Sequence, residues 1–586
     1  MDKIGIACLF LLGAGAVAPA APAQLQQNST SPPAVLRATT RLVHVDVVVT
    51  DSSGHPPGNP LTAENFTILE DGEPQKVTFF SFHPMEEEEK RQPPQLPPHV
   101  VTNRPEYQRN SGPPVILLLD GLNTPADNQM VVRLQMLKFL ADNFDPHTRM
   151  AVYVLGNELS VLQDFTSDPA VLAAALRKYR SQNAAEGRPN GTDTQMQAPK
   201  FEGVNLPPQA AGQFQAGGGG TGEAGSRSAF NLSFILARFE KEAAASAMEM
   251  RVERTTEALS LIARRLAGFP GRKIVIWFSA SFPLNLSMVD PEDIDVFRSY
   301  ADRVRQATNL LSDAQVAIYT VDARGLVGSA IADPSESGRD AGGRMNLTVG
   351  QHMNANSKEA FERFNRQDSL VKVAQETGGR SFLNTNDFGR AISEGVRDGS
   401  TFYALGYYPS RKRWDGKFHT IKVKLARDGL SARHRRGYYA LDPGDWRKAG
   451  GAEMKTALAN DAVSSTGVLF YARALPSSAS AEVKIEFLVD AHTITFETGA
   501  ENQRFCSLEF QVQAFTPEGK LVKAEVQQAE APLKPQTFSR IQQSGLPMPV
   551  PLKLEPGDYV LRLGVRDNRT GLFGTAELPL TVAPAP

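Results

Sequence analysis

The sequence Pro114-Val-Ile-Leu-Leu-Leu-Asp120-Gly-Leu-Asn-Thr124-Pro125 holds the most direct information about the architecture of this chain. Five apolar residues follow one another from Val115 to Leu119. Such a run without polar alternation is typical of a strand that is buried on both faces of a parallel sheet. The run ends in an acid, a glycine and a helix start. Because open α/β sheets bind ligands beyond the carboxyl ends of their strands, the sequence predicts that Asp120 lies at a ligand-binding edge.

Strands and helices alternate after this stretch. Thr124 suits an N-cap, Pro125 the first helical position and Asp127 the first turn, which predicts a helix from 125 to 144. Further strands are predicted at 149–155, 159–165, 274–279, 314–321 and 381–383, and further helices at 169–179, 228–267, 291–311, 369–377 and 387–396. This order predicts an α/β domain over residues 113–399 with a doubly wound, mostly parallel sheet. Two polar, glycine-rich stretches, 181–226 and 325–360, are predicted to be insertions in it.

The sequence segments on both sides of this domain have the short strand patterns and turn residues that are typical of β structure. We expect a β segment at 37–83, a Pro-rich acidic linker at 84–112, a second β segment at 400–442, a linker at 443–480 and an Ig-like β-sandwich at 481–586. Each of the two β segments is small, and both flank the α/β domain. We therefore expect the strands of 41–82 to pack beside those of 402–440.

The N-terminus has the pattern of an export signal. Lys3 precedes an apolar stretch, 4–17, that is too short to span a bilayer, and Ala21-Pro22-Ala23 offers small residues for cleavage. We predict a signal peptide at 1–23 and a flexible leader at 24–36, and an uncleaved anchor is the alternative. The mature chain is then secreted or periplasmic, without a membrane span. Signal removal leaves Cys506 alone, and its phase on an alternating strand predicts a buried, inert thiol.

Composition and motifs argue against several functional classes. The formal net charge is -2, which gives no general argument for nucleic-acid binding. A basic stretch at 411–413 and 433–436 lies among aromatic residues, and we interpret it as a solvated sheet face. None of the nine histidines has the spacing of a zinc site, and Gly-x-Ser-x-Gly, His-Glu-x-x-His and P-loop motifs are absent from the sequence. The sequence predicts no catalytic residue.

Several motifs taken together resemble those of a known family. The strand end Asp120-x-x-x-Thr124, the strand after Pro270-Gly-Arg-Lys273 and the segment Leu370-x-x-x-Ala-x-x-Thr-Gly-Gly-x-x-Phe382 are similar to a von Willebrand factor type A (VWFA) domain. The segments Asn65-Phe-Thr-Ile-Leu-Glu-Asp-Gly72 and Tyr403-Ala-Leu-Gly-Tyr-Tyr-Pro409 resemble those of bacterial VWFA-related proteins of the Acidobacterial type. The resemblance covers about residues 38–442, and it implies a Rossmann-like sheet with flanking β segments.

Type A domains often carry a metal-ion-dependent adhesion site, in which Mg²⁺ takes hard oxygen ligands. The resemblance implies a degenerate form of this site, with candidate ligands Asp120, Thr124 and Ser279 and supporting residues Asn123, Ser281 and Asp322. Leu122 stands where the family has a serine, and Ser279 where it has an aspartate. The distal threonine corresponds to Thr255 or Thr256. The alternative is that Asp120 bonds neighbouring loop amides while Thr124 only caps the helix.

The resemblance implies an exported interaction or adhesion protein that binds a protein or glycan partner at the loop edge of the sheet. Mg²⁺ or another divalent cation is its one candidate cofactor. Two alternatives stay open from the sequence. One is a structural or assembly module with a vestigial metal site, and the other is an exported hydrolase with a non-standard site.

Overall fold

A computed structural model gives the structure of the chain, and residues 41–586 form one compact unit. It describes residues 42–84, 96–97, 100–104, 107, 113–181, 246–269, 271–282, 294–326, 364, 367–410, 415–441, 454, 457–459, 464–476, 482–498 and 503–583, with only the helix backbone over 294–301. The predicted signal peptide, the leader and nearly all of both insertions lie outside the described residues. Among the described residues, no helix combines the length and the apolar character needed to cross a membrane.

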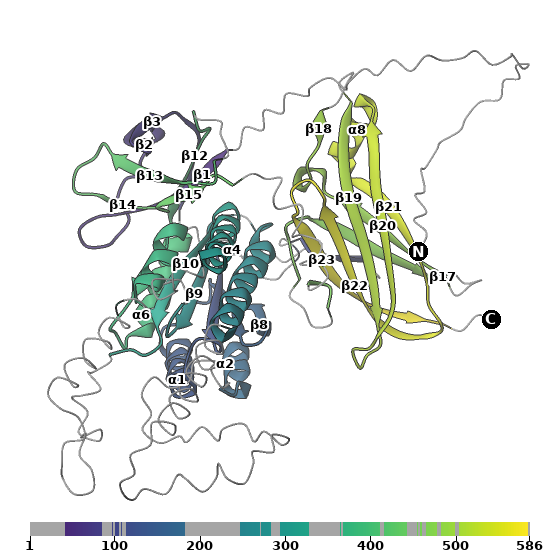
Figure 1. The fold of residues 1–586 in the computed structure, drawn as a ribbon, viewed down its shortest axis with the longest axis horizontal. Helices are drawn as coiled ribbons and strands as arrows, with labels where there is room; N and C mark the ends of the chain where they lie inside the picture. The colour runs from purple at the N-terminus through teal and green to yellow at the C-terminus, as the bar shows by residue number, and fades with distance from the viewer. Residues whose placement is uncertain are drawn as a thin grey trace, which may run out of the picture. The chain divides into compact units, whose positions relative to one another are not determined.

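The α/β domain is built on a six-stranded sheet, of which Figure 1 labels β8, β9 and β10. The order of the strands is β11-β10-β9-β6-β7-β8. Its strands are β6 (Pro114–Asp120), β7 (Arg149–Leu155), β8 (Leu159–Thr166), β9 (Lys273–Ser279), β10 (Val316–Asp322) and β11 (Ser381–Phe382). Five strands are parallel, and β8 runs antiparallel to β7. Only residues 156–158 separate β7 from β8, and a parallel connection needs a longer crossover. Every residue of β6 is buried, as the apolar run predicted.

Helices cover both faces of this sheet. The helices are α1 (Ala126–Asp142), α2 (Pro169–Lys178), α4 (Ile294–Asp313), α6 (Phe388–Ser400) and the helical residues 246–266 and 367–377. One apolar core joins the sheet to α1, α2 and α6. A second core joins its other face to α4 and the helical residues 246–266 and 367–377. The coarse part of the fold prediction, a mixed α/β chain with a sheet that contains parallel strands, is confirmed.

The two predicted β segments share two antiparallel sheets. Their strands are β1 (Val43–Thr50), β2 (Phe66–Glu70), β3 (Glu73–Gln75), β4 (Val77–His83), β12 (Phe402–Tyr407), β13 (Phe418–Leu425), β14 (Ser431–Arg433) and β15 (Gly437–Tyr439). The orders are β14-β1-β12-β4 and β15-β13-β2-β3. β12 therefore lies between β1 and β4, although more than 300 residues separate them in the chain. One apolar core contains side chains from both sheets.

The C-terminal part consists of two antiparallel sheets around one core. Its elements are β5 (Val100–Thr102), β16 (Phe470–Pro476), β17 (Glu482–Val489), β18 (Glu497–Thr498), β19 (Arg504–Phe515), β20 (Leu521–Leu533), α8 (Pro535–Ser544), β21 (Leu546–Lys553), β22 (Gly557–Asp567) and β23 (Phe573–Val582). β5 and β16 pair with each other inside segments that we expected to be linkers. β5 has only three residues and lies in a proline-rich segment. Three residues are too few to show the alternating pattern of a strand, so the sequence did not predict β5. Cys506 on β19 is buried, as predicted, and burial raises the pKa of its thiol to about 11.

Candidate functional site

The carboxyl ends of three neighbouring strands bring the predicted site residues together. β9 lies between β6 and β10, and the register sets Leu119 beside Phe278 and Asp322 beside Ser279. The amides of Gly121 and Leu122 both donate to the carbonyl of Leu155, at 2.7 and 3.0 Å, which holds the loop after β6 against β7. Asp120, Ser279 and Asp322 therefore lie at one edge of the sheet, where an open α/β sheet places its ligands.

The carboxylate of Asp120 is almost completely buried, with 2% of the residue exposed. Its Oδ1 accepts hydrogen bonds from the amides of Leu122 at 3.1 Å and Asn123 at 2.8 Å. Its Oδ2 accepts from Asn123 Nδ2 at 2.9 Å, Trp277 Nε1 at 3.1 Å and Ser279 Oγ at 2.7 Å. A carboxylate has about four lone-pair sites. The four N–H donors alone match these sites, the hydroxyl of Ser279 is a fifth neighbour, and all five groups come from the protein.

Burial raises the pKa of the Asp120 carboxyl, although the hydrogen bonds from Asn123, Ser279 and Trp277 act in the opposite direction. A divalent ion at this carboxylate would have to displace at least one of these donors, because Mg²⁺ also binds through the oxygen lone pairs. The arrangement is a closed hydrogen-bond network, and it contains the contact with neighbouring loop amides that the sequence left as the alternative to a metal site.

Thr124 does not cap α1, so that prediction was wrong. Pro125 is the N-cap, and the helix begins at Ala126. The Oγ1 of Thr124 instead accepts a hydrogen bond from the amide of Ala280 at 3.1 Å. Gln129 fixes the same loop from α1, since its Nε2 donates to the carbonyl of Thr124 at 2.7 Å. The hydroxyl of Thr124 therefore ties the β6–α1 loop to the end of β9.

Ser279, Asn123 and Ser281, which the prediction also named, join the same network. Ser279 Oγ lies 2.7 Å from both Asp120 Oδ2 and the carbonyl oxygen of Ser281, and its single proton can be donated to either of them. Asn123 Nδ2 also donates to Thr255 Oγ1 at 3.1 Å. Of the two threonines that the sequence offered for the distal position, Thr255 is thus the one that reaches the site. Thr256 instead bonds the carbonyl of Val252, one turn earlier in its own helix.

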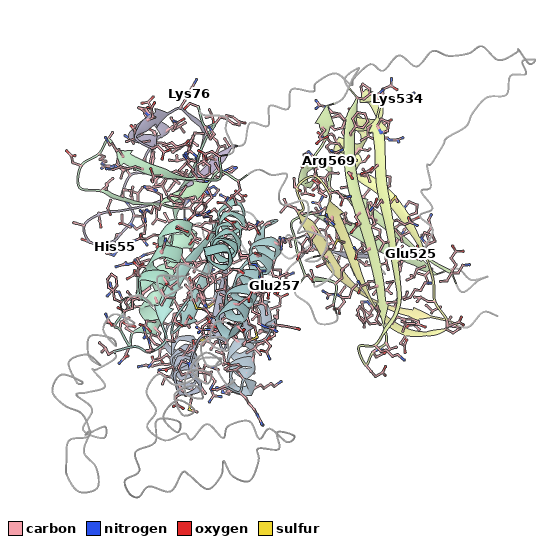
Figure 2. The ribbon with its side chains drawn as sticks, viewed as in Figure 1. His55, Lys76, Glu257, Glu525, Lys534 and Arg569 are labelled. Carbon is pink, nitrogen blue, oxygen red and sulfur yellow. The ribbon has the colours of Figure 1, made fainter. Side chains whose placement is uncertain are left out.

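Arg251 is the residue of this site that sequence reasoning missed. Its Nε donates to Asn123 Oδ1 at 2.9 Å, and its NH2 donates to Ser281 Oγ at 3.1 Å. The side chain is partly exposed, whereas every residue that it contacts here is buried. A guanidinium cation therefore covers the network that begins at Asp120. Arg251 belongs to the helical residues 246–266, which also carry the exposed Glu257 (Figure 2).

Asp322 lies on the same edge but in a different network. Arg324 binds both of its oxygens, through Nε at 2.9 Å and NH2 at 2.9 Å, and the amide of Arg324 donates to Oδ1 at 3.1 Å. Gln367 Nε2 donates to Oδ2 at 3.3 Å. Asp322 is 1% exposed, so this bidentate pair neutralises a buried carboxylate. The edge thus presents two guanidinium groups above two buried carboxylates.

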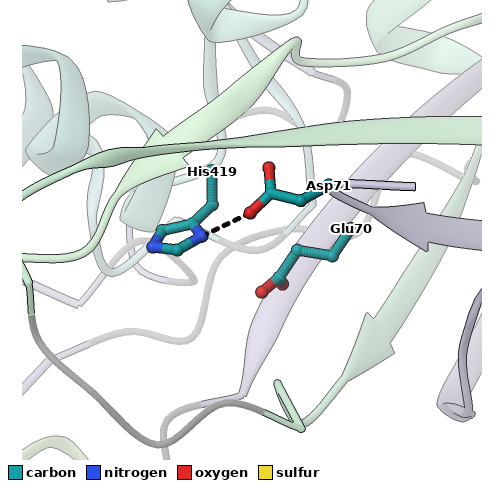
Figure 3. A group of neighbouring side chains, drawn as sticks. All are labelled: Glu70, Asp71 and His419. Atoms are coloured by element: carbon teal, nitrogen blue, oxygen red, sulfur yellow. Dashed lines mark hydrogen bonds and ion pairs between the residues drawn. The ribbon is translucent and has the colours of Figure 1, made fainter. Parts of the chain in front are cut away.

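A second group of chemically suitable side chains lies in the β segments and consists of Glu70, Asp71 and His419 (Figure 3). His419 Nδ1 lies 2.8 Å from Asp71 Oδ2, and its Nε2 lies 3.2 Å from Asp415 Oδ1. Glu70 accepts from the hydroxyls of Tyr407 at 2.5 Å and Tyr438 at 3.3 Å. Carboxylates on both ring nitrogens are typical of an imidazolium that holds two segments together.

Comparison with known proteins finds no related family and solved structures of low similarity. No family model matches the chain, and no curated protein matches it. Among solved structures, it is similar to an aerotolerance-related membrane protein from Bacteroides fragilis NCTC 9343, carrying multiple mutations to serine, with 11% identity and a TM-score of 0.21. It is also similar to the conserved hypothetical protein BatB from Bacteroides thetaiotaomicron, with 13% identity and a TM-score of 0.21. Each match covers 49% of this chain and 99% of the other. A TM-score this low supports no conclusion about fold or activity.

Proposed function

We propose that this chain is an exported interaction protein of the von Willebrand factor type A kind, in which the carboxyl edge of the six-stranded sheet binds a protein or glycan partner. The motifs of the sequence support the type A assignment, and the sheet order with helices on both faces is compatible with it. We also propose that the C-terminal pair of sheets is an Ig-like sandwich that holds and spaces the binding domain.

The observation that carries this proposal is the position of Arg251 over Asn123 and Ser281. In a type A adhesion site, the metal supplies the positive charge that attracts an acidic group of the partner. Here we propose that the guanidinium of Arg251 supplies that charge, with Arg324 beside it on the next part of the edge. A guanidinium binds carboxylate or sulfate through two parallel hydrogen bonds. The partner group that fits this chemistry is therefore a carboxylate or a sulfate.

The second candidate is a degenerate metal site that uses Asp120, Thr124 and Ser279. The observation in its favour is that these three residues lie in one hydrogen-bond network, with the hydroxyl of Ser279 on Asp120 and that of Thr124 on the next loop. If a divalent ion bound there, these oxygens would be its ligands. We favour the metal-free proposal because five protein donors already occupy the oxygens of Asp120.

The test is binding of the full chain to immobilised polyglutamate and to a sulfated polysaccharide, with Mg²⁺ and with EDTA. We expect binding that EDTA leaves unchanged and that Arg251→Glu abolishes. Arg427→Glu is the matched control, because Arg427 is an exposed arginine in the turn between β13 and β14. Binding that EDTA removes would favour the metal site instead. Equal binding by both charge-reversed variants would contradict the role of the carboxyl edge.

A further inference from the structure

A small cavity lies where the β segments meet the amino end of the six-stranded sheet, on the opposite side from the carboxyl edge. Its volume is about 20 Å³, and a water molecule or a single ion of similar size needs about 10–15 Å³ by the same measure. It is lined by His44 and Asp46 of β1, Arg435 between β14 and β15, Arg272 immediately before β9, Ser312 of α4, Gln315, Val316 and Thr377. We call it the β1–β9 cavity. Elements distant in the sequence thus line one small polar space that is partly open to solvent.

Three donors of this cavity have no acceptor among the residues that the structure describes: Arg435 Nε, Arg272 Nε and Ser312 Oγ. Within that part of the chain, the guanidinium of Arg435 makes no hydrogen bond or ion pair, and its carbon atom lies 5.9 Å from the centre of the Tyr438 ring. Arg435 is 7% exposed and Arg272 3% exposed. Buried polar groups are normally hydrogen-bonded, so donors of this kind need a water molecule or an ion as their partner.

The charges around the cavity are unequal. Three buried cations, Arg272, Lys273 and Arg435, surround Asp46, whose Oδ1 accepts a hydrogen bond from Gln315 at 2.9 Å. The neighbouring carboxylate of Asp398 is already paired with Arg433. Burial lowers the pKa of Lys273 to about 8, and Asp46 opposes that shift only in part.

Buried charges that lack partners are strongly unfavourable. A water molecule would fill the space, but it brings no negative charge and accepts only two hydrogen bonds. An anion meets both needs, since it accepts from the guanidinium groups and offsets the excess positive charge. A volume of about 20 Å³ fits a monatomic anion and is small for phosphate, sulfate or a side-chain carboxylate.

We propose that the β1–β9 cavity binds a small inorganic anion of the size of chloride, held by Arg272, Arg435 and Ser312. The ion links the turn before β15 to α4 and to the amino end of the sheet. It therefore stabilises the attachment of the β segments to the α/β domain. This role is independent of any partner at the carboxyl edge.

Thermal unfolding of the full chain in sodium chloride, compared with sodium gluconate at the same ionic strength, tests the proposal. A ligand that binds only the folded state raises the unfolding temperature in a saturable way. We expect chloride and bromide to do so and gluconate not to. Equal unfolding temperatures in all three salts would show that the cavity holds only water and would overturn the proposal.

Three variants make the test specific. Arg435→Met keeps the volume and removes the charge, so it should abolish the chloride effect. Ser312→Ala removes one neutral hydrogen bond and should weaken the apparent chloride affinity by about fivefold. Arg427→Met is the control, because Arg427 is an exposed arginine in the turn between β13 and β14, outside the cavity lining, and should leave the chloride response intact. Should Arg435→Met fail to fold, Ser312→Ala decides, and an unchanged chloride affinity in that variant would overturn the proposal.

A crystal of the full chain grown in bromide locates the ion directly. We expect an anomalous peak between Arg272, Arg435 and Ser312. The absence of a peak there at saturating bromide would contradict the site.

Discussion

Asp120 shows how a residue can be well placed in the fold and still have a different chemistry from the one its position suggests. Its place at the end of β6 could be predicted, because an unbroken apolar run and a following turn are local signals. Its bonds to the loop amides were one of the alternatives that the sequence left open, and the family resemblance placed Ser279 beside it. The bond from Trp277 was not predicted, because that residue lies more than 150 residues later. The contact between Arg251 and Asn123 was not predicted either, because the long insertion separates these two residues in the sequence.

Replacing Asp120 removes the acceptor of five buried donors. We predict that Asp120→Ala lowers the free energy of unfolding by about 3 kcal/mol or more, because buried donors that lose their acceptor keep their full desolvation penalty. Asp127→Ala, in the exposed first turn of α1, is the control and should change stability by about 1 kcal/mol or less. Urea titration of both variants measures the difference. Equal losses would show that the network around Asp120 contributes nothing special.

His419 makes stability depend on pH near neutrality. Burial acts to lower its pKa, but hydrogen bonds to Asp71 and Asp415 outweigh it and raise the pKa above its ordinary value. A raised folded-state pKa adds stability that is complete below about pH 6.5 and is lost as the pH rises through the folded value. We predict that the free energy of unfolding declines just above pH 6.5. His419→Gln should flatten this decline, and an unchanged profile in that variant would assign it to another group.

Among the secondary-structure elements, the strands that the sequence predicted correctly are those with long apolar runs. The predicted strands at 149–155 and 274–279 match β7 and β9, because both are continuous apolar runs. The direction of β8 and the existence of β5 were missed. A strand's direction depends on the length of its connection, and a three-residue edge strand is defined by its distant partner β16.

The Gly378-Gly379 pair of the family motif ends the helical residues 367–377 where backbone segments approach closely. A Cβ on Gly379 would lie 1.9 Å from the carbonyl oxygen of Ile318 in β10. We predict that Gly379→Ala lowers the free energy of unfolding by about 3 kcal/mol, at the upper end of overpacking effects. Gly429→Ala is the matched control, since that glycine has a left-handed φ of +77° but open space around it, and it should cost about 1 kcal/mol. Thermal or urea unfolding compares the two, and a Gly379→Ala chain as stable as Gly429→Ala would contradict the packing argument.

At the scale of the whole molecule, the β segments depend on pairing across the α/β domain. β1 and β4 both pair with β12, and β2 pairs with β13. We predict that residues 42–84 expressed alone have no protected amides, because their apolar side chains lose the core that β12 and β13 complete. Within a chain of residues 42–441, the same amides should resist hydrogen exchange. Protected amides in the isolated segment would contradict this dependence.

The central claim is that the carboxyl edge of the six-stranded sheet binds its partner without a divalent ion. The most direct test is whether divalent ions change the thermal stability of the chain. An ion that binds only the folded state raises the unfolding temperature. The measurement is thermal unfolding of the full chain and of Asp120→Asn in Mg²⁺, Mn²⁺, Ca²⁺ and EDTA. We predict no difference among these four conditions for the parent chain. A metal-dependent rise in the parent chain that Asp120→Asn abolishes would contradict the claim and establish Asp120 as a metal ligand.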